Sequence, residues 1–92
     1  MIRIYKYPLG ESLVVTAPIV KPLRVDFQGG EPFLWAAIDD NKPDISISVL
    51  CVGTGWTMDG EVLDHYLNTT VQSSDPFVWH WFWKEYKEEE LE

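Results

Sequence analysis

The chain has 92 residues, 46% of them hydrophobic, and a formal net charge of −8 at pH 7. This length suits one domain with a single core and leaves no room for a second. The negative charge excludes DNA and anionic membranes as ligands, because binding either of them requires a basic surface.

The cysteine count and the N-terminal segment predict the compartment. Cys51 has no second cysteine to pair with, which suits a reducing environment. The N-terminal stretch M-I-R-I-Y-K-Y lacks the apolar core of a signal peptide, and no segment reaches the roughly 20 apolar residues of a membrane span. We therefore expect a cytoplasmic protein.

The first part of the chain is typical of strands and turns. Residues 2–7 alternate in the period-two pattern of a strand, and the β-branched residues of segment 12–16 predict a second one. Because a short turn around Gly10 separates them, we expect these two strands to pair as a hairpin. Residues 17–22 carry two prolines, which lack ladder donors, and predict an irregular crossing segment or a frayed sheet edge.

Residues 23–38 predict a β-hairpin that we take as the nucleus of the fold. Apolar and polar side chains alternate up to Gln28, and a more apolar strand returns after the turn. Gly29 and Gly30 can both adopt the positive φ that a tight two-residue turn requires. The polar residues 39–44 then predict an exposed loop.

The second half of the chain predicts three more strands and one short helix. Residues 45–52 and 68–72 have strand patterns, and residues 59–67 between them have helix-like spacing, with Asp59 as the N-cap. The last strand, residues 77–83, has two largely apolar faces: Phe77, Trp79, Trp81 and Trp83 on one, and Val78, His80 and Phe82 on the other. This strand is either central and buried on both sides, or it offers an aromatic stripe to another chain.

Together these elements predict a mostly β (β-rich α+β) domain over residues 1–84. We expect a small antiparallel β-sandwich or open barrel of six to seven short strands with one short helix. The connections are too short for the crossover helices of a parallel sheet. Residues 85–92 form an acidic tail that we expect to be frayed or disordered.

Motifs for catalysis or metal binding are weak. Gly53-Thr54-Gly55 could turn backbone N–H groups toward an anion, but a turn between a strand and a helix is the better interpretation of this motif. His65 and His80 have no metal-ligand spacing between them, and a catalytic role would require one of them to meet a carboxylate in a cleft. We therefore predict no catalytic residue, no metal site and no cofactor.

Aromatic residues are the stronger candidates for function. The chain has five Trp and four Tyr, and exposed rings of these types contribute much of the energy at protein interfaces. The candidate binding residues are Trp56, Tyr66, Trp79, His80, Trp81 and Trp83. The alternative is that some of these rings simply fill the core. Because both faces of the last strand are apolar, we also expect a homo-oligomeric contact.

Sequence motifs from residue 4 to residue 82 share a pattern with a known group. They are I-Y-K-Y-P-L, P-L-R-V-D-F-Q-G-G-E-P-F-L-W-A-A-I-D, V-G-T-G, Y-L-N-T-T-V-Q and V-W-H-W-F. Together they resemble a family of small uncharacterised proteins encoded by phages and prophages, most specifically over residues 28–38. Relatives often have histidine where this chain has Trp56, so a role for that histidine does not carry over. The resemblance implies phage origin and a place in the host bacterial cytoplasm.

These observations lead to one main functional hypothesis and two alternatives. The main hypothesis is a non-enzymatic phage-type accessory protein that binds a host or defence-system protein. The first alternative is an oligomer that sequesters a small molecule such as a nucleotide signal, with Arg3, Lys6 or Arg24 facing phosphate and an aromatic ring stacking on the base. The second alternative is an uncharacterised enzyme.

Overall fold

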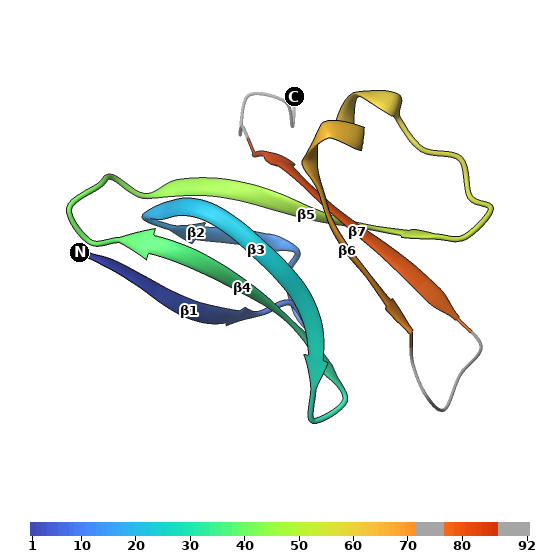
Figure 1. The fold of residues 1–92 in the computed structure, drawn as a ribbon, viewed down its shortest axis with the longest axis horizontal. Coiled ribbons are helices and arrows are strands. Elements are labelled where there is room, and N and C mark those ends of the chain that lie inside the picture. The colour runs from blue at the N-terminus through green and yellow to red at the C-terminus, as the bar shows by residue number, and fades with distance from the viewer. Residues whose placement is uncertain (72–76, 87–92) are drawn as a thin grey trace.

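The computed structural model describes residues 1–71 and 77–86, which form antiparallel strands and one short helix. The elements in chain order are β1 (Ile2–Pro8), β2 (Val14–Ala17), β3 (Ile19–Gln28), β4 (Glu31–Asp39), β5 (Ile45–Gly53), the 3-10 helix η1 (Gly60–His65), β6 (Tyr66–Val71) and β7 (Val78–Glu85). They make two sheets, here called sheet A (β1-β4-β3) and sheet B (β2-β5-β7-β6) (Figure 1). The predicted mostly β fold class is confirmed, and these two sheets do not close into a barrel within the described ranges.

The β3–β4 hairpin has the predicted position and turn. Gln28 pairs directly with Glu31, and the two glycines between them have φ values of 62° and 84°. Positive φ at both turn positions matches the right-handed twist of the flanking strands, which explains why two glycines occur there. β4 lies at the centre of sheet A, and its Leu34 side chain is fully buried.

The expected hairpin between the first two strands is wrong. β1 pairs with β4 in sheet A, and β2 pairs with β5 in sheet B. The physical reason is the segment between them, where Leu9 is buried in the core and its N–H donates to the carbonyl of Pro32. Burial of this side chain carries the chain from one sheet to the other instead of folding it back on itself.

Residues 19–22 of the proline-bearing segment become the start of an edge strand, whereas Ala17 ends β2 in sheet B. β3 begins at Ile19 and runs along the edge of sheet A, with register shifts on either side of Pro22. An edge strand needs only half of its N–H groups for its neighbour, so it accommodates a proline at such an irregularity. The expectation of a sheet edge is therefore met, but the segment is more regular than a frayed one.

The predicted helix is shorter and tighter than its spacing indicates. η1 ends at His65, and the next two residues already belong to β6. Asp59 is the N-cap as predicted, because its Oδ1 accepts the N–H of Glu61. Leu63 is 59% exposed, so η1 buries little apolar surface and remains a single short 3-10 segment.

The core lies between the sheets and takes side chains from five strands and from Leu9 in the connection after β1. Its members are Leu9, Val15, Ala17, Ile19, Val25, Leu34, Ala36, Ile38, Ile47, Val49 and Trp81. One polar side chain links the two sheets at the edge of sheet A: Asn68 of β6 accepts the N–H of Val25 at 2.8 Å and donates to its carbonyl at 2.6 Å. The amide thereby satisfies both backbone groups of a fully buried residue on the opposite sheet.

The last strand extends farther than predicted. β7 reaches Glu85, which pairs with Ile47, and the N–H of Tyr86 donates to the carbonyl of Ser46. The first residues of the expected acidic tail are therefore ordered against β5. Residues 87–92, the remainder of that tail, and residue 72 of the expected sixth strand lie outside the described residues.

Candidate functional site

β7 is a central strand, which is one of the two interpretations that the sequence allowed. It lies between β5 and β6 in sheet B, and two successive side chains, Trp81 and Phe82, are buried on its opposite faces. The Trp81 ring packs edge-on against Phe27 of sheet A, and its Nε1–H donates to Oγ1 of Thr70 at 2.9 Å. On the outer side, Phe82 packs edge-on against Tyr66. Trp81 is therefore a core residue.

Three rings gather where the core ends, and we call them the aromatic cluster: Trp56, Phe77 and Trp79. The Trp79 ring makes an edge contact with Trp56 and a tilted contact with Phe77, each at a centroid distance of 5.6 Å. Trp56 is 62% exposed and Phe77 is 55% exposed, whereas Trp79 is half-buried. Trp79 therefore contacts both the core and the two exposed rings of the cluster.

The two glycines of the Gly-Thr-Gly turn hold Trp56 in place by different means. Gly55 has a φ of 91°, and the N–H of Trp56 donates to the carbonyl of Gly53 at 3.0 Å, which closes the turn. Gly53 lies directly under the indole: a Cβ at that position would come within 2.8 Å of Cε2 of Trp56. The motif is therefore explained by ring packing and turn geometry.

His80 lies next to the cluster in a chain of side-chain hydrogen bonds on the outer face of sheet B. Its Nε2 shares a hydrogen bond of 2.7 Å with the Thr54 hydroxyl, and its Nδ1 shares one of 3.0 Å with the hydroxyl of Thr69. Thr69 in turn shares a 2.5 Å hydrogen bond with the hydroxyl of Tyr66. These bonds fix the rotamers of two predicted site residues, Tyr66 and His80, and tie the glycine turn to β6 and β7.

The other histidine has a different environment. The His65 ring stacks on Trp83, with a centroid distance of 4.3 Å and an interplanar angle of 14°. In the ranges 1–71 and 77–86, neither histidine bonds a carboxylate, and no group of three or more His, Cys, Asp and Glu side chains could hold a metal ion. The same ranges contain no helix long and apolar enough to cross a membrane.

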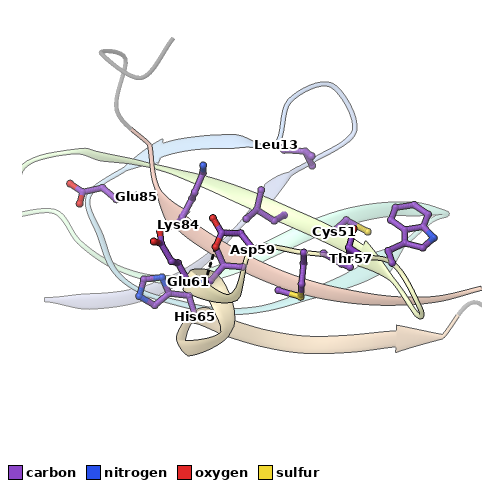
Figure 2. A pocket seen from close by; sticks show the side chains of 13 residues that line it. Leu13, Cys51, Thr57, Asp59, Glu61, His65, Lys84 and Glu85 are labelled. Atoms are coloured by element: carbon purple, nitrogen blue, oxygen red, sulfur yellow. Dashed lines mark hydrogen bonds between the residues drawn. The ribbon is translucent and has the colours of Figure 1, made fainter. Parts of the chain in front are cut away.

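Two pockets adjoin the glycine turn, and Trp56 lines both of them. The smaller has a volume of about 370 Å³ and is lined by Gly53, Thr54, Trp56, Phe77, Val78 and Trp79. The larger, of about 680 Å³, lies between η1 with its preceding loop and the strands β5 and β7 (Figure 2). Asp59, Glu61 and Glu85 line it against Lys84 and His65, so carboxylates outnumber the cationic side chains in its wall.

Cys51 also lines the larger pocket. The rate at which its thiol reacts with a reagent tests how strongly burial protects this side chain. Burial raises the pKa of the Cys51 thiol, and the thiolate is the form that reacts. We expect iodoacetamide to alkylate the folded protein several-fold more slowly at mildly alkaline pH than the urea-unfolded protein. The pH at which the rate is half-maximal should be higher in the folded state. Equal rates and equal midpoints would contradict the half-buried position of this side chain.

The predicted binding residues therefore divide into four groups. Trp56 and Trp79 meet in the aromatic cluster, while Tyr66 and His80 lie beside it on the outer face of sheet B. Trp81 is buried in the core. Trp83 is half-buried and packs against the core and against His65.

Phe77 and Thr69 contribute to this region but are not among the binding residues predicted from the sequence. Phe77 shared the alternation of the last strand and could have been found from that signal. Thr69 faces His80 because of the β6–β7 register, which shifts after Tyr66, and no local sequence pattern encodes that shift.

Fold and site together define a class: an open two-sheet β-sandwich that carries an exposed, rigidly supported aromatic cluster at one end. The chain belongs to the family described as Domain of unknown function (DUF7352), whose model matches residues 1–92. This agrees with the resemblance to an uncharacterised family. Comparison with curated proteins and with solved structures gives no match.

Proposed function

We propose that this protein is a non-enzymatic accessory protein of phage type that acts by binding, and that the aromatic cluster contacts a host or defence-system protein. The observation that carries the proposal is Trp56, which is 62% exposed and yet held on three sides by Gly53, the closed turn and Trp79. A large apolar ring that remains exposed loses the stabilisation that burial would provide. Contact with a partner would bury the ring and recover that stabilisation.

The rigidity of the cluster strengthens this proposal. Binding normally costs about 0.5–1.5 kcal/mol for each flexible side chain that must be immobilised. Trp56 and Trp79 are already ordered by mutual packing, and the turn that carries Trp56 is tied to β6 through Thr54 and His80. Most of that cost is therefore met in the unbound protein, as is typical of interface hot spots.

Sequestration of a small molecule is the second candidate, supported by the larger pocket. Its volume of about 680 Å³ lies in the range of ligand sites. Its wall carries three carboxylates beside Lys84 and His65, which suits a cationic ligand better than a nucleotide phosphate. The three residues predicted to face phosphate, Arg3, Lys6 and Arg24, belong to sheet A and do not line this pocket.

Capture from bacterial lysate with single-residue variants tests the main proposal. A partner retained by the wild type should be lost with Trp56→Ala and weakened about ten-fold or more with Gly53→Ala, because the added Cβ displaces the indole. Tyr5→Ala, which removes a 45% exposed ring from sheet A, is the matched control and should retain the partner. Recovery of no partner, or equal recovery by Trp56→Ala, would refute the proposal.

A further inference from the structure

The outer face of sheet A, turned away from the core, combines aromatic, aliphatic and cationic side chains in register. Lys6 of β1, Trp35 of β4 and Arg24 of β3 lie opposite one another in one row across the three strands. Ile4 and Lys21 lie opposite Ala37 in the next row. Residues aligned in this way project from the same side of a sheet, about 5 Å apart from strand to strand.

A shallow apolar hollow occupies the middle of this face. It has a volume of about 290 Å³ and is lined by Ile4, Leu23, Arg24, Asp26 and Trp35. Ile4 is 62% exposed, and Leu23 is 37% exposed. The outer face of a sandwich is ordinarily polar, so contiguous apolar side chains here indicate a contact surface.

The face is also rich in cations for so acidic a chain. Three of the seven Lys and Arg residues project from it: Lys6, Lys21 and Arg24. Arg24 pairs with Asp26 of the same strand at 3.1 Å, and Asp39 on this face pairs with the N-terminal amine.

Lys6 and Lys21 have no carboxylate within ion-pair distance in the described part of the chain. Lys6 instead donates to Gln28 and lies 4.8 Å from the centre of the Phe33 ring. No described carboxylate neutralises these two lysine charges, which lie on the two edge strands beside the apolar hollow.

We propose that the outer face of sheet A binds an acidic segment of a partner protein. An apolar side chain of that segment enters the hollow beside Trp35, and carboxylates on either side of it pair with Lys6 and Lys21. The hollow accommodates one apolar side chain, and the cations flank it on both edge strands, so spacing and charge fit a short acidic stretch with an apolar anchor.

Two other occupants fit the face less well. A second copy would bring a second set of lysines to the contact, and the two carboxylates of this face, Asp26 and Asp39, are already paired within the chain, so that copy would offer Lys6 and Lys21 few free anionic partners. A nucleotide would find an open surface instead of a cleft that buries most of the ligand, and its ring edges would meet Ile4 and Leu23. An extended protein segment needs no such enclosure.

This surface is separate from the aromatic cluster, which lies at the end of sheet B. Substitution of Trp56 should leave the sheet A contact intact, and substitution of Lys6 and Lys21 should leave the cluster intact. The failure of one proposal is therefore distinguishable from the failure of the other.

Selection from a displayed library of random short peptides on the immobilised full-length protein tests the inference. The enriched peptides should combine several Asp or Glu residues with one large apolar residue. In fluorescence anisotropy, the best peptide should bind the Lys6→Glu/Lys21→Glu variant about ten-fold more weakly than the wild type, and high salt should weaken its binding. Ile4→Ser should also weaken it, because that side chain forms part of the hollow.

The charge-matched control is Lys42→Glu/Lys84→Glu, which changes the net charge by the same amount at two lysines outside the residue rows that carry Lys6 and Lys21, one in the loop after β4 and one in β7. It should bind the peptide like the wild type, and near-ultraviolet circular dichroism should show that all variants are folded. The proposal is overturned by no enrichment, by peptides without excess acid, or by equal binding to the Lys6→Glu/Lys21→Glu variant. It is also overturned if a nucleotide displaces the peptide, or if light scattering shows a wild-type dimer that Ile4→Ser dissociates.

Discussion

Replacing Trp81 by alanine is expected to lower the free energy of unfolding by about 4 kcal/mol, whereas the same replacement at Trp56 should lower it by no more than about 1 kcal/mol. Trp81 is 4% exposed, packs against Phe27 across the two sheets and donates a hydrogen bond to the buried Thr70 hydroxyl. Its loss opens a large cavity and leaves that hydroxyl without its donor. Replacement of Trp56 removes the edge contact with Trp79 and the packing on Gly53, but this ring is 62% exposed and leaves no enclosed cavity.

Urea unfolding followed by far-ultraviolet circular dichroism measures both effects. Small domains have a total stability of roughly 5–15 kcal/mol, so the Trp81→Ala protein should lose a large fraction of its stability and unfold at a clearly lower urea concentration. Trp81→Phe retains most of the ring volume and serves as the control, with a smaller expected loss. If Trp56→Ala proved as destabilising as Trp81→Ala, the exposed ring would be a structural residue and the proposed interface would lose its basis.

Replacing Asn68 by leucine should cost about 2–4 kcal/mol, because it leaves two buried backbone groups without partners. The Asn68 amide binds both the N–H and the carbonyl of Val25, which is fully buried. Leucine has a similar volume, so the loss comes from hydrogen bonding more than from packing. Asn68→Asp should also destabilise, since a carboxylate oxygen would face the Val25 carbonyl in place of the amide donor.

The control for this prediction is Asn41→Leu. Asn41 lies in an exposed turn, where only its backbone N–H forms a described bond, to Asp39. Its replacement should change the free energy of unfolding by less than about 0.5 kcal/mol. A neutral Asn68→Leu substitution would show that water or a rearranged strand satisfies Val25, and the link between the sheets would then be unimportant for stability.

Local features of the sequence were sufficient for the individual strands. The β3–β4 hairpin could be predicted because its alternation and its Gly29-Gly30 turn act over neighbouring residues. The path from β1 to β2 could not, because it depends on Leu9 finding the core and on the carbonyl of Pro32, both remote in sequence. Pairing partners are decided by such tertiary contacts more than by strand propensity.

The candidate site likewise combines features that the local sequence predicts with features that depend on tertiary contacts. The aromatic residues of β7 and the Gly-Thr-Gly-Trp turn can each be recognised in the sequence. Their meeting depends on the β5–β7 register, which sets Gly53 opposite Trp79. The close approach of Trp56 to Gly53 explains why glycine precedes the threonine, but it is visible only once the turn is folded.

The Asn68 hydrogen bonds also limit the pairing of β3 with a strand of another molecule. β3 is an edge strand, and its outward backbone groups would ordinarily template a strand from another molecule. At Val25 these groups are already bonded to the side chain of Asn68, and Val25 pairs with Leu34 on its other flank. The middle of this edge is therefore closed to strand addition, and the Val25 amide should exchange with deuterium far more slowly than its edge position would suggest.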